Sequence, residues 1–347
     1  MRSDSPLVSV VIPTRDRPDM VGRAVRSALQ QTIAELEVIV VVDGPDLNTD
    51  AALKLIQASD SRLRIVSLPQ NVGGADARNA GIEAAKGEWV ALLDDDDEWM
   101  AHKLEAQLAL AEKSSHRSPV ISCKIIGRTP IMDYIWPTTQ PTLPIAEYLM
   151  RRRGLFQGEG DLRSTTLVAR RDLFLQCPFT SGLKKHQDYD WVIRAFSVPG
   201  VGLEFVREPL VICHLEENRA GISAHHDWRY SLDWVNSIRP LINARTYASF
   251  LLTKISASAA AQRDWAAFFP LLIAAVKKGK PRAIHFAIYI GMWAIPIKAR
   301  RVIKSTLLGG PRRFEKSQRN MAAPSTDVQQ ASDAASHLTG SVHYGPE

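Results

Sequence analysis

A dense group of carboxylates follows a short apolar run near residue 90. Trp89–Leu93 is apolar, as expected of a buried strand, and four aspartates, Asp94–Asp97, come directly after it. Adjacent like charges repel one another and are not tolerated in a core, so we expect them at the exposed end of the strand. Oxygen ligands of this kind suit Mg²⁺ or Mn²⁺, which also bind substrate phosphates. A solvated acidic turn that opens the next helix would explain the same residues.

Polar residues also follow two other predicted strands. Leu7–Ile12 and Leu36–Val42 are rich in β-branched residues; Thr14 and Arg15 follow the first, and Asp43 follows the second. Each residue alone could simply end a strand. Helical patterns lie between the strands, and this alternation predicts a mostly parallel α/β sheet flanked by helices. Because ligands bind outside the carboxyl ends of such strands, we expect these side chains to form one site.

Composition places the chain among ordinary globular proteins. It has 347 residues and a net charge of +6. A mildly positive charge favours anionic partners such as nucleotides or acidic lipids. Taken alone, this charge gives little support for nucleic-acid binding. The three cysteines, Cys123, Cys177 and Cys213, are too far apart for a metal motif, and an odd count argues against a disulfide framework. No apolar stretch reaches the roughly 18 residues of a spanning helix, and we see no signal peptide. We therefore expect a cytoplasmic location.

The chain divides by composition into four parts. We expect residues 1–117 to form the first half of the α/β domain and residues 118–235 a less regular second half. Residues 236–308 are predicted to be a helical extension, and the polar segment 309–347 a disordered tail.

Four segments occur in an order that is similar to one enzyme family. Pro13–Arg17, Asp43, Asn71–Gly81 and Leu93–Trp99 resemble the nucleotide-sugar-binding half of family-two glycosyltransferases, which have the GT-A (Rossmann-like) fold. The resemblance covers residues 7 to 225. It implies inverting transfer of a sugar from a nucleotide-diphosphate donor to a hydroxyl of a glycan or lipid-linked acceptor. The setting it implies is surface polysaccharide biosynthesis.

The resemblance also implies roles for individual residues around the donor. The family's Asp-x-Asp motif lies within Asp94–Asp96; Asp96 first, and then Asp94, would hold a divalent cation, Mn²⁺ or Mg²⁺. Asp97 and Glu98 are then expected to begin the next helix. Arg219 would bind the diphosphate, with an ordinary surface arginine as the alternative. The remaining residues expected at the nucleotide or its ribose are Pro13, Thr14, Arg15, Asp43, Arg78, Asp94 and Asp95.

The catalytic base implied by the resemblance is Asp188. It lies in His186-Gln187-Asp188-Tyr189-Asp190, where Gln187 replaces a glutamate that is frequent in the family. A base must take the proton from the acceptor hydroxyl during direct displacement. The alternative is that Asp188 or Asp190 caps the helix that follows. His214 lies after a predicted strand, at a place where the family sometimes has a phosphate or metal contact.

Two features concern partners and rival functions. Lysines and arginines flank the apolar runs Trp265–Val276 and Ala283–Ile297. We therefore expect residues 265–304 to contact a membrane surface, at the inner face of the cell membrane. The alternative is that these helices pack on the catalytic domain.

A nucleotidyltransferase would also use carboxylates at a sheet edge, but Pro13–Arg17 lacks the glycines of its phosphate loop. A non-catalytic nucleotide-sugar-binding protein is the other alternative.

Overall fold

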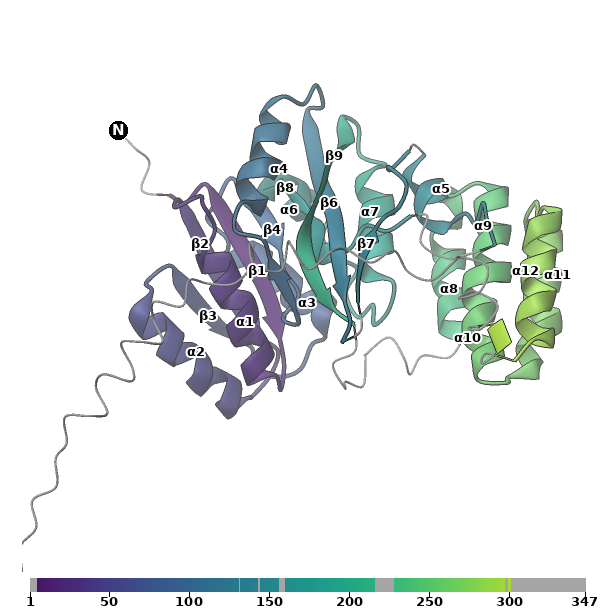
Figure 1. Cartoon of the computed structure of the whole chain (residues 1–347), viewed down its shortest axis with the longest axis horizontal. Helices are drawn as coiled ribbons and strands as arrows, with labels where there is room; N and C mark the ends of the chain where they lie inside the picture. Colours follow the sequence, from purple (N-terminus) through teal and green to yellow (C-terminus); the bar gives the residue numbers. More distant parts are fainter. Residues whose placement is uncertain are drawn as a thin grey trace, which may run out of the picture. The chain divides into compact units, whose positions relative to one another are not determined.

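The computed structural model describes residues 5–130, 132–142, 144–155, 160–215, 228–296 and 299–300, all within one compact unit. Arg219 and the predicted tail, residues 309–347, lie outside the described residues. The described part of the chain is a mixed α/β fold followed by helices (Figure 1).

One sheet runs through the α/β part. Four parallel strands form its first half, in the order β3 (Leu63–Ser67), β2 (Leu36–Val42), β1 (Val8–Thr14) and β4 (Trp89–Leu92). Beyond β4 the order continues with β8 (Val168–Arg170), β6 (Ser118–Arg128), β9 (Val201–His214) and β5 (Asp97–Trp99), while β7 (Asp133–Trp136) pairs with β6. The predicted α/β sheet, mostly parallel and flanked by helices, is therefore confirmed.

Helices cover both faces of this sheet because its central strands are apolar on both sides. Every residue of β2 is buried; Val38 and Val40 pack with one cluster of apolar side chains, and Ile39 and Val41 with another. The first cluster includes residues of α1 (Pro18–Leu29), α2 (Leu47–Ser59) and α4 (Lys103–Glu112). The second includes residues of α3 (Gly74–Ala84), α6 (Arg171–Gln176) and α7 (Gln187–Ala195).

The prediction that Asp97 and Glu98 begin a helix is wrong. They belong to β5, which pairs with β9 so that Asp97 lies opposite Cys213, and α4 begins only at Lys103. Trp99 is buried at the end of β5. The pairing is made with residues more than 110 positions later in the chain, so local charge could not reveal it. The sequence also predicts two short strands, Leu203–Val206 and Leu210–Cys213, and the structure joins them in one continuous strand, β9.

The C-terminal part of the described chain is helical, as expected. Its elements are α8 (Trp228–Ser237), α9 (Ala244–Phe250), a π-helical turn η4 (Leu251–Ile255), α10 (Ser256–Ala261), α11 (Phe268–Lys278) and α12 (Ala283–Ala294). α9 packs against α5 (Ile145–Met150), and the indole of Trp234 donates to Asp190 of α7 at 3.0 Å. Among the described residues, no helix combines the length and the apolar character needed to cross a membrane.

Candidate active site

Residues from the ends of β1 and β4 meet at one edge of the sheet. β1 pairs in parallel with β4, so Thr14 at the end of β1 lies near the aspartates that follow β4. The Thr14 hydroxyl donates to Asp95 at 2.8 Å, and the Arg17 guanidinium donates to Asp95 at 2.9 Å and to Asp96 at 3.4 Å. The topology therefore gathers the predicted residues of these two segments, as the alternation of strands and helices led us to expect.

The four aspartates have different surroundings. Asp95 and Asp97 are buried, while the side chains of Asp94 and Asp96 are 27% and 20% exposed. Burial raises the pKa of Asp95 to about 6, although the charge of Arg17 opposes this. Burial and the charges of Asp96 and Asp94 raise the pKa of Asp97 well above its ordinary value. Of the four aspartates, Asp94 and Asp96 therefore have the more exposed side chains.

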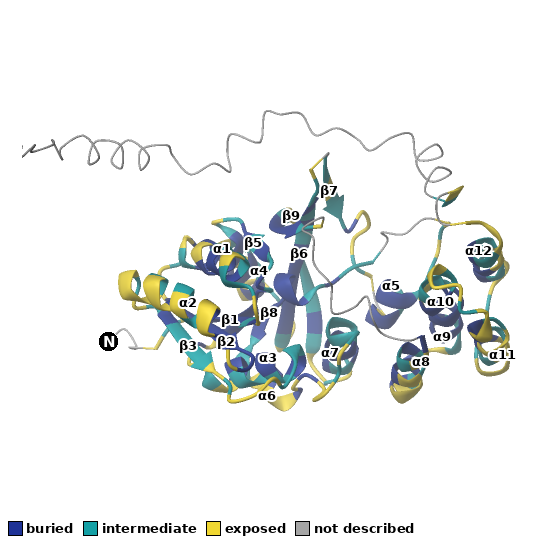
Figure 2. Cartoon of the chain, turned by 90° about the horizontal axis from the view of Figure 1, so that it is seen from below, coloured by how far each residue is buried: buried dark blue, intermediate teal, exposed yellow. Residues whose placement is uncertain are grey.

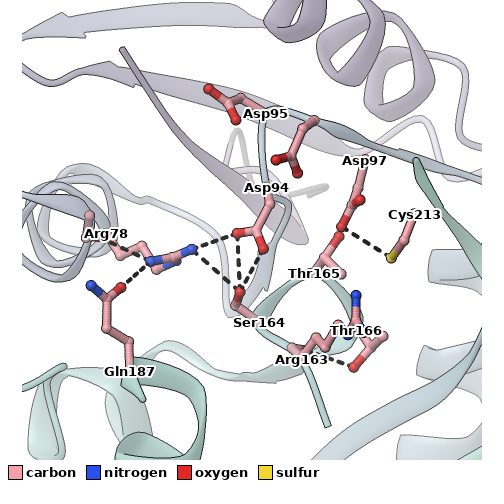
Figure 3. A network of polar contacts seen from close by, with 12 residues as sticks. Arg78, Asp94, Asp95, Asp97, Arg163, Ser164, Thr165, Thr166, Gln187 and Cys213 are labelled. Carbon is pink, nitrogen blue, oxygen red and sulfur yellow. Dashed lines mark hydrogen bonds and ion pairs between the residues drawn. The ribbon is translucent and has the colours of Figure 1, made fainter. Parts of the chain in front are cut away.

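Asp94 is held by a buried arginine and a serine (Figure 3). Arg78 of α3 donates to Asp94 at 2.5 Å and to the Gln187 amide oxygen at 2.6 Å. The Ser164 hydroxyl lies 3.0 Å from both oxygens of Asp94. Arg78 therefore links the end of β4 to the start of α7, although these segments are distant in the sequence.

Asp188 lies in the first turn of α7, directly after Gln187. Its side chain is partly buried, and Arg78, Asp94 and Ser164 lie close enough to shift its pKa. Burial and the nearby charge of Asp94 raise the pKa of Asp188 to about 6, while Arg78 and Ser164 act in the opposite direction. A carboxylate with such a pKa is ionised at neutral pH and still basic enough to accept a proton.

The alternative in which Asp188 or Asp190 caps this helix is wrong. The cap position is His186, which has a positive φ of 68° and makes no side-chain capping bond. Its ring instead stacks on Trp234, with the ring centroids 4.4 Å apart. Asp190 is buried within the helix and accepts from Thr180, Arg194 and Trp234 at 2.6, 2.8 and 3.0 Å.

The other predicted donor residues are less tightly connected. Both oxygens of Asp43 accept backbone N–H groups, from Val72 at 2.7 Å and from Gly73 at 3.0 Å. Gly73 has φ of 90°, and Asp43 thereby fixes the loop that leads into α3. Arg15 is near the surface beside Asp16, and Pro13 lies within β1. The predicted contacts of these residues with a nucleotide stay predictions.

Four residues at the site had no role in the sequence-based hypothesis. Ser164 and Gln187 join the Arg78 network, and Arg17 contacts the aspartates. Glu98 forms an ion pair with Arg23 at 3.3 Å and pairs with His214 at 2.6 Å. Arg17 could have been found, because it is a cation beside the predicted Thr14–Arg15 segment. Ser164 carried no signal, because a single serine in a predicted strand resembles many others.

The accessible carboxylates suit the cation that the family resemblance implies. Mg²⁺ and Mn²⁺ favour carboxylate oxygens, and Mg²⁺ is often held by one or two carboxylates together with substrate phosphates and water. Asp94 and Asp96 provide two such groups. Within the described ranges there is no group of three or more His, Cys, Asp or Glu side chains that could hold a metal ion without further ligands. The residues therefore fit a cation bound jointly with a phosphate ligand.

Comparison with known sequences decides the family. The profile described as "Glycosyl transferase family 2" matches residues 9–176, which include β1–β4, the acidic run and Ser164. The chain belongs to glycosyl transferase family 2. It is therefore a glycosyltransferase.

Two relatives illustrate the similarity. The amylovoran biosynthesis glycosyltransferase AmsB of Erwinia amylovora is 28% identical over 70% of this chain and 82% of its own length. An Escherichia coli enzyme, UDP-Glc:alpha-D-GlcNAc-diphosphoundecaprenol beta-1,3-glucosyltransferase WfgD, is 35% identical over 32% of this chain. That match spans 44% of the E. coli protein, so it concerns only a part of each chain.

Solved structures support the same fold. S. aureus TarS 1–349, crystallised with UDP-GlcNAc, has a TM-score of 0.52 and 19% identity, covering 89% of this glycosyltransferase and 93% of that chain. The mannosyltransferase PcManGT of Pyrobaculum calidifontis, in complex with GDP-Man and Mn²⁺, has a TM-score of 0.50 and 18% identity, covering 88% and 85%. At these identities the likeness concerns the fold alone.

Proposed function

We propose that this glycosyltransferase moves a sugar, with inversion, from a nucleotide-diphosphate donor to a hydroxyl of a glycan or lipid-linked acceptor. The observation that carries the proposal is that Asp188 lies close to Arg78 and Ser164, the two residues that hold Asp94. A basic carboxylate then lies beside the carboxylates expected at the donor. The names of AmsB and WfgD support a setting in surface polysaccharide biosynthesis.

In the proposed mechanism Asp188 takes the proton of the acceptor hydroxyl while that oxygen attacks the anomeric carbon. Arg78 keeps Asp94 and Gln187 in fixed positions, so that the donor side and the base keep a constant separation. Asp94 and Asp96 would hold a divalent cation, which stabilises the negative charge of the departing nucleoside diphosphate. Thr14 and Arg17 hold Asp95 away from the accessible side.

We also propose that the helical extension contacts a membrane surface. Four side chains on one face of α11 and the turn before it are exposed: Trp265, Phe269, Ile273 and Val276. Lys277, Lys278, Lys280 and Arg282 follow them directly, and no aspartate or glutamate occurs between Asp264 and Glu315. An apolar face beside positive charge favours an interface with anionic lipid, which would suit a lipid-linked acceptor.

Two aspartates of α7 offer a matched test of the base. We expect Asp188→Asn to lower transfer by at least 100-fold, the effect usual for losing a general base. The melting temperature at neutral pH should stay the same or rise, because an aspartate whose pKa is raised from 3.8 to about 6 on folding lowers stability progressively between those two pH values, and the full loss is present above pH 6. Asp190→Asn should instead lower stability by about 1–3 kcal/mol, because it weakens three buried hydrogen bonds.

The measurements are donor consumption with Mn²⁺ or Mg²⁺ over a set of nucleotide-diphosphate sugars, and thermal unfolding of each variant. Asp188→Asn as active as the wild type would remove Asp188 from the mechanism. Pyrophosphate release from a nucleoside triphosphate would instead favour a nucleotidyltransferase.

A further inference from the structure

Side chains from β5 and α4 hold the short helical turn η1 (Ser164–Thr166), which is buried. The indole N–H of Trp99 donates to the backbone carbonyl of Thr165 at 3.0 Å. The side-chain amide of Gln107 donates to the backbone carbonyl of Thr166 at 2.8 Å. Both carbonyls lie at the end of the turn, where a short helix leaves backbone acceptors without partners of its own. Trp99 and Gln107 therefore supply hydrogen bonds that the turn cannot make internally.

The same turn is joined to the carboxylate of Asp94. The Ser164 hydroxyl lies 3.0 Å from both oxygens of Asp94, and Figure 3 shows it directed toward that carboxylate. Directly after the turn, the carbonyl of Leu167 accepts from the N–H of Leu92 at 3.1 Å, two residues before Asp94. A displacement of η1 would therefore change the contact between Ser164 and Asp94.

The burial of Gln107 indicates that its hydrogen bond to η1 matters. Gln107 is 0% exposed, and three of its buried neighbours on α4 are apolar, namely Leu104, Leu108 and Ala111. Its Oε1 atom is buried and has no hydrogen-bond partner among the residues that the structure describes. An unpaired buried amide oxygen costs free energy, which a methionine of similar length would avoid. What a methionine would lack is the donor to Thr166.

The ring of Trp99 is fixed in a way that directs its N–H group. The ring is buried, and the Lys103 ammonium lies 3.8 Å from its centroid. The backbone N–H of Trp99 donates to the Ser27 hydroxyl at 3.1 Å. These contacts hold the residue with its indole N–H directed at Thr165. A phenylalanine at this position would keep an aromatic ring beside Lys103 and would lose the N–H donor.

We propose that Trp99 and Gln107 are positioning residues, which hold η1 so that Ser164 fixes the orientation of Asp94. This inference rests on the proposed function, because there Asp94 helps to hold the divalent cation beside the donor phosphates. Both side chains are buried, so they act through the turn. Residues that orient the ligands of a metal ion affect its affinity nearly as strongly as the ligands themselves do. Loosening η1 should therefore weaken binding of the cation together with the nucleotide.

Conservative variants with a matched control test this role. We expect Trp99→Phe and Gln107→Met each to weaken Mn²⁺ binding about tenfold, by calorimetry on protein saturated with UDP or GDP. Trp228→Phe is the control, because Trp228 is also buried, with Arg229 4.5 Å from its ring centroid and its indole donating to Asp264 at 2.7 Å. The control should lose thermal stability as well, but it should keep the wild-type affinity for Mn²⁺.

Two further measurements separate action through the turn from a general loss of stability. Adding Trp99→Phe to Ser164→Ala should cause no further loss of Mn²⁺ affinity, because the hydroxyl that Trp99 positions is already absent. Hydrogen exchange is measured without metal at residues 166 and 167, whose amide N–H groups bond to carbonyls at the start of the turn. Relative to the amides of β2, this exchange should rise at least tenfold in Trp99→Phe and stay unchanged in Trp228→Phe.

The inference is overturned if Trp99→Phe and Gln107→Met bind Mn²⁺ like the wild type, or if Trp228→Phe loses the same affinity. Full additivity of Trp99→Phe with Ser164→Ala would also contradict it, because Trp99 would then act by another route. A wild type that binds no Mn²⁺ with either nucleotide would instead contradict the cation role in the proposed function. In that case hydrogen exchange still decides the inference, because unchanged exchange in Trp99→Phe would show that the turn does not depend on Trp99.

Discussion

Among single residues, Arg78 has the largest influence on the proposed chemistry. The residue is 9% exposed; its guanidinium contacts Asp94 and Gln187, and its charge also acts on Asp188. One positive charge is therefore shared by two carboxylates that repel each other. Because Gln187 is neutral, a third negative charge does not compete for the arginine. This charge balance makes the pKa of the base sensitive to Arg78.

This sensitivity gives a prediction for the pH dependence of transfer. The pKa of Asp188 is about 6, so kcat/KM should fall as pH drops through about 6, where the base becomes protonated. Removing the positive charge with Arg78→Met should raise that pKa and move the acidic limb to higher pH, measured at saturating donor. Arg62→Met, which removes an arginine paired with Asp60, is the control and should leave the limb in place. An unchanged limb in Arg78→Met would contradict the proposed coupling.

The sequence indicated which residues would meet at the site but not which contacts they make. Asp94, Arg78 and Asp188 were expected at one site, and the structure joins them through Ser164 and Gln187. The Arg78–Gln187 contact spans 109 positions, and the Ser164–Asp94 contact spans 70. Such contacts depend on how distant strands and helices are placed, and no local pattern of residue types encodes them.

Among the secondary-structure elements, α3 is the one whose position decides where Arg78 lies. A Cβ added at Gly81 would come within 2.4 Å of Val11 and 3.0 Å of Val41, so α3 approaches β1 and β2 as closely as only glycine allows. Gly81 follows Arg78 by three residues, nearly one helical turn. Any displacement of α3 at this contact would therefore move Arg78 relative to Asp94.

Two glycine substitutions test this packing. We expect Gly81→Ala to destabilise the protein by about 1–3 kcal/mol through overpacking, despite the better helix propensity of alanine, and to lower transfer as well. Gly22→Ala in α1 is the matched control, because its nearest neighbour is the flexible end of Arg26 at 3.4 Å. That variant should gain up to about 1 kcal/mol, measured by urea unfolding. Equal stability of the two variants would contradict the role assigned to Gly81.

The sequence predicted some strands correctly and missed others, for a physical reason. β1, β2 and β4 are short apolar runs between helices, and local composition is sufficient to identify them. β5 is charged, and it is a strand only because Asp97 and Trp99 pair with β9 and are buried there. The segment Arg128–Leu143 contains three prolines and predicts a loop, whereas the structure has the strand β7 within it. Pairing with the distant β9 overrides local propensity in β5, and pairing with the neighbouring β6 does so in β7.

At the scale of the whole molecule, exposed apolar side chains gather on the helical extension. Trp265, Phe269, Ile273 and Val276 are 61%, 67%, 49% and 53% exposed and share one face of α11 and the turn before it. In Figure 2 exposed residues, coloured yellow, lie on α11 and also on α2. α2 exposes Leu47 and Leu55 as well, at 85% and 78%, but no comparable run of lysines follows them. The two regions therefore differ in charge rather than in apolar exposure.

This difference allows the membrane proposal to be tested against an internal control. We expect the wild type to sediment with vesicles that contain phosphatidylglycerol, to bind neutral vesicles weakly, and to dissociate as salt is added. Trp265→Ser/Phe269→Ser should lower partitioning at least tenfold, because each large apolar side chain contributes about 1.5–3 kcal/mol when buried. Leu47→Ser/Leu55→Ser should bind like the wild type.

Charge and apolar contact can be separated in the same assay. Lys277→Glu/Lys278→Glu should abolish the preference for anionic vesicles while leaving the weaker binding to neutral vesicles, since each basic residue near the surface contributes about 1 kcal/mol. Equal binding to neutral and anionic vesicles by the wild type would contradict the electrostatic part of the proposal. A concentration-dependent dimer that is lost in Trp265→Ser/Phe269→Ser, with no vesicle binding, would assign the face of α11 to a second copy of the chain instead.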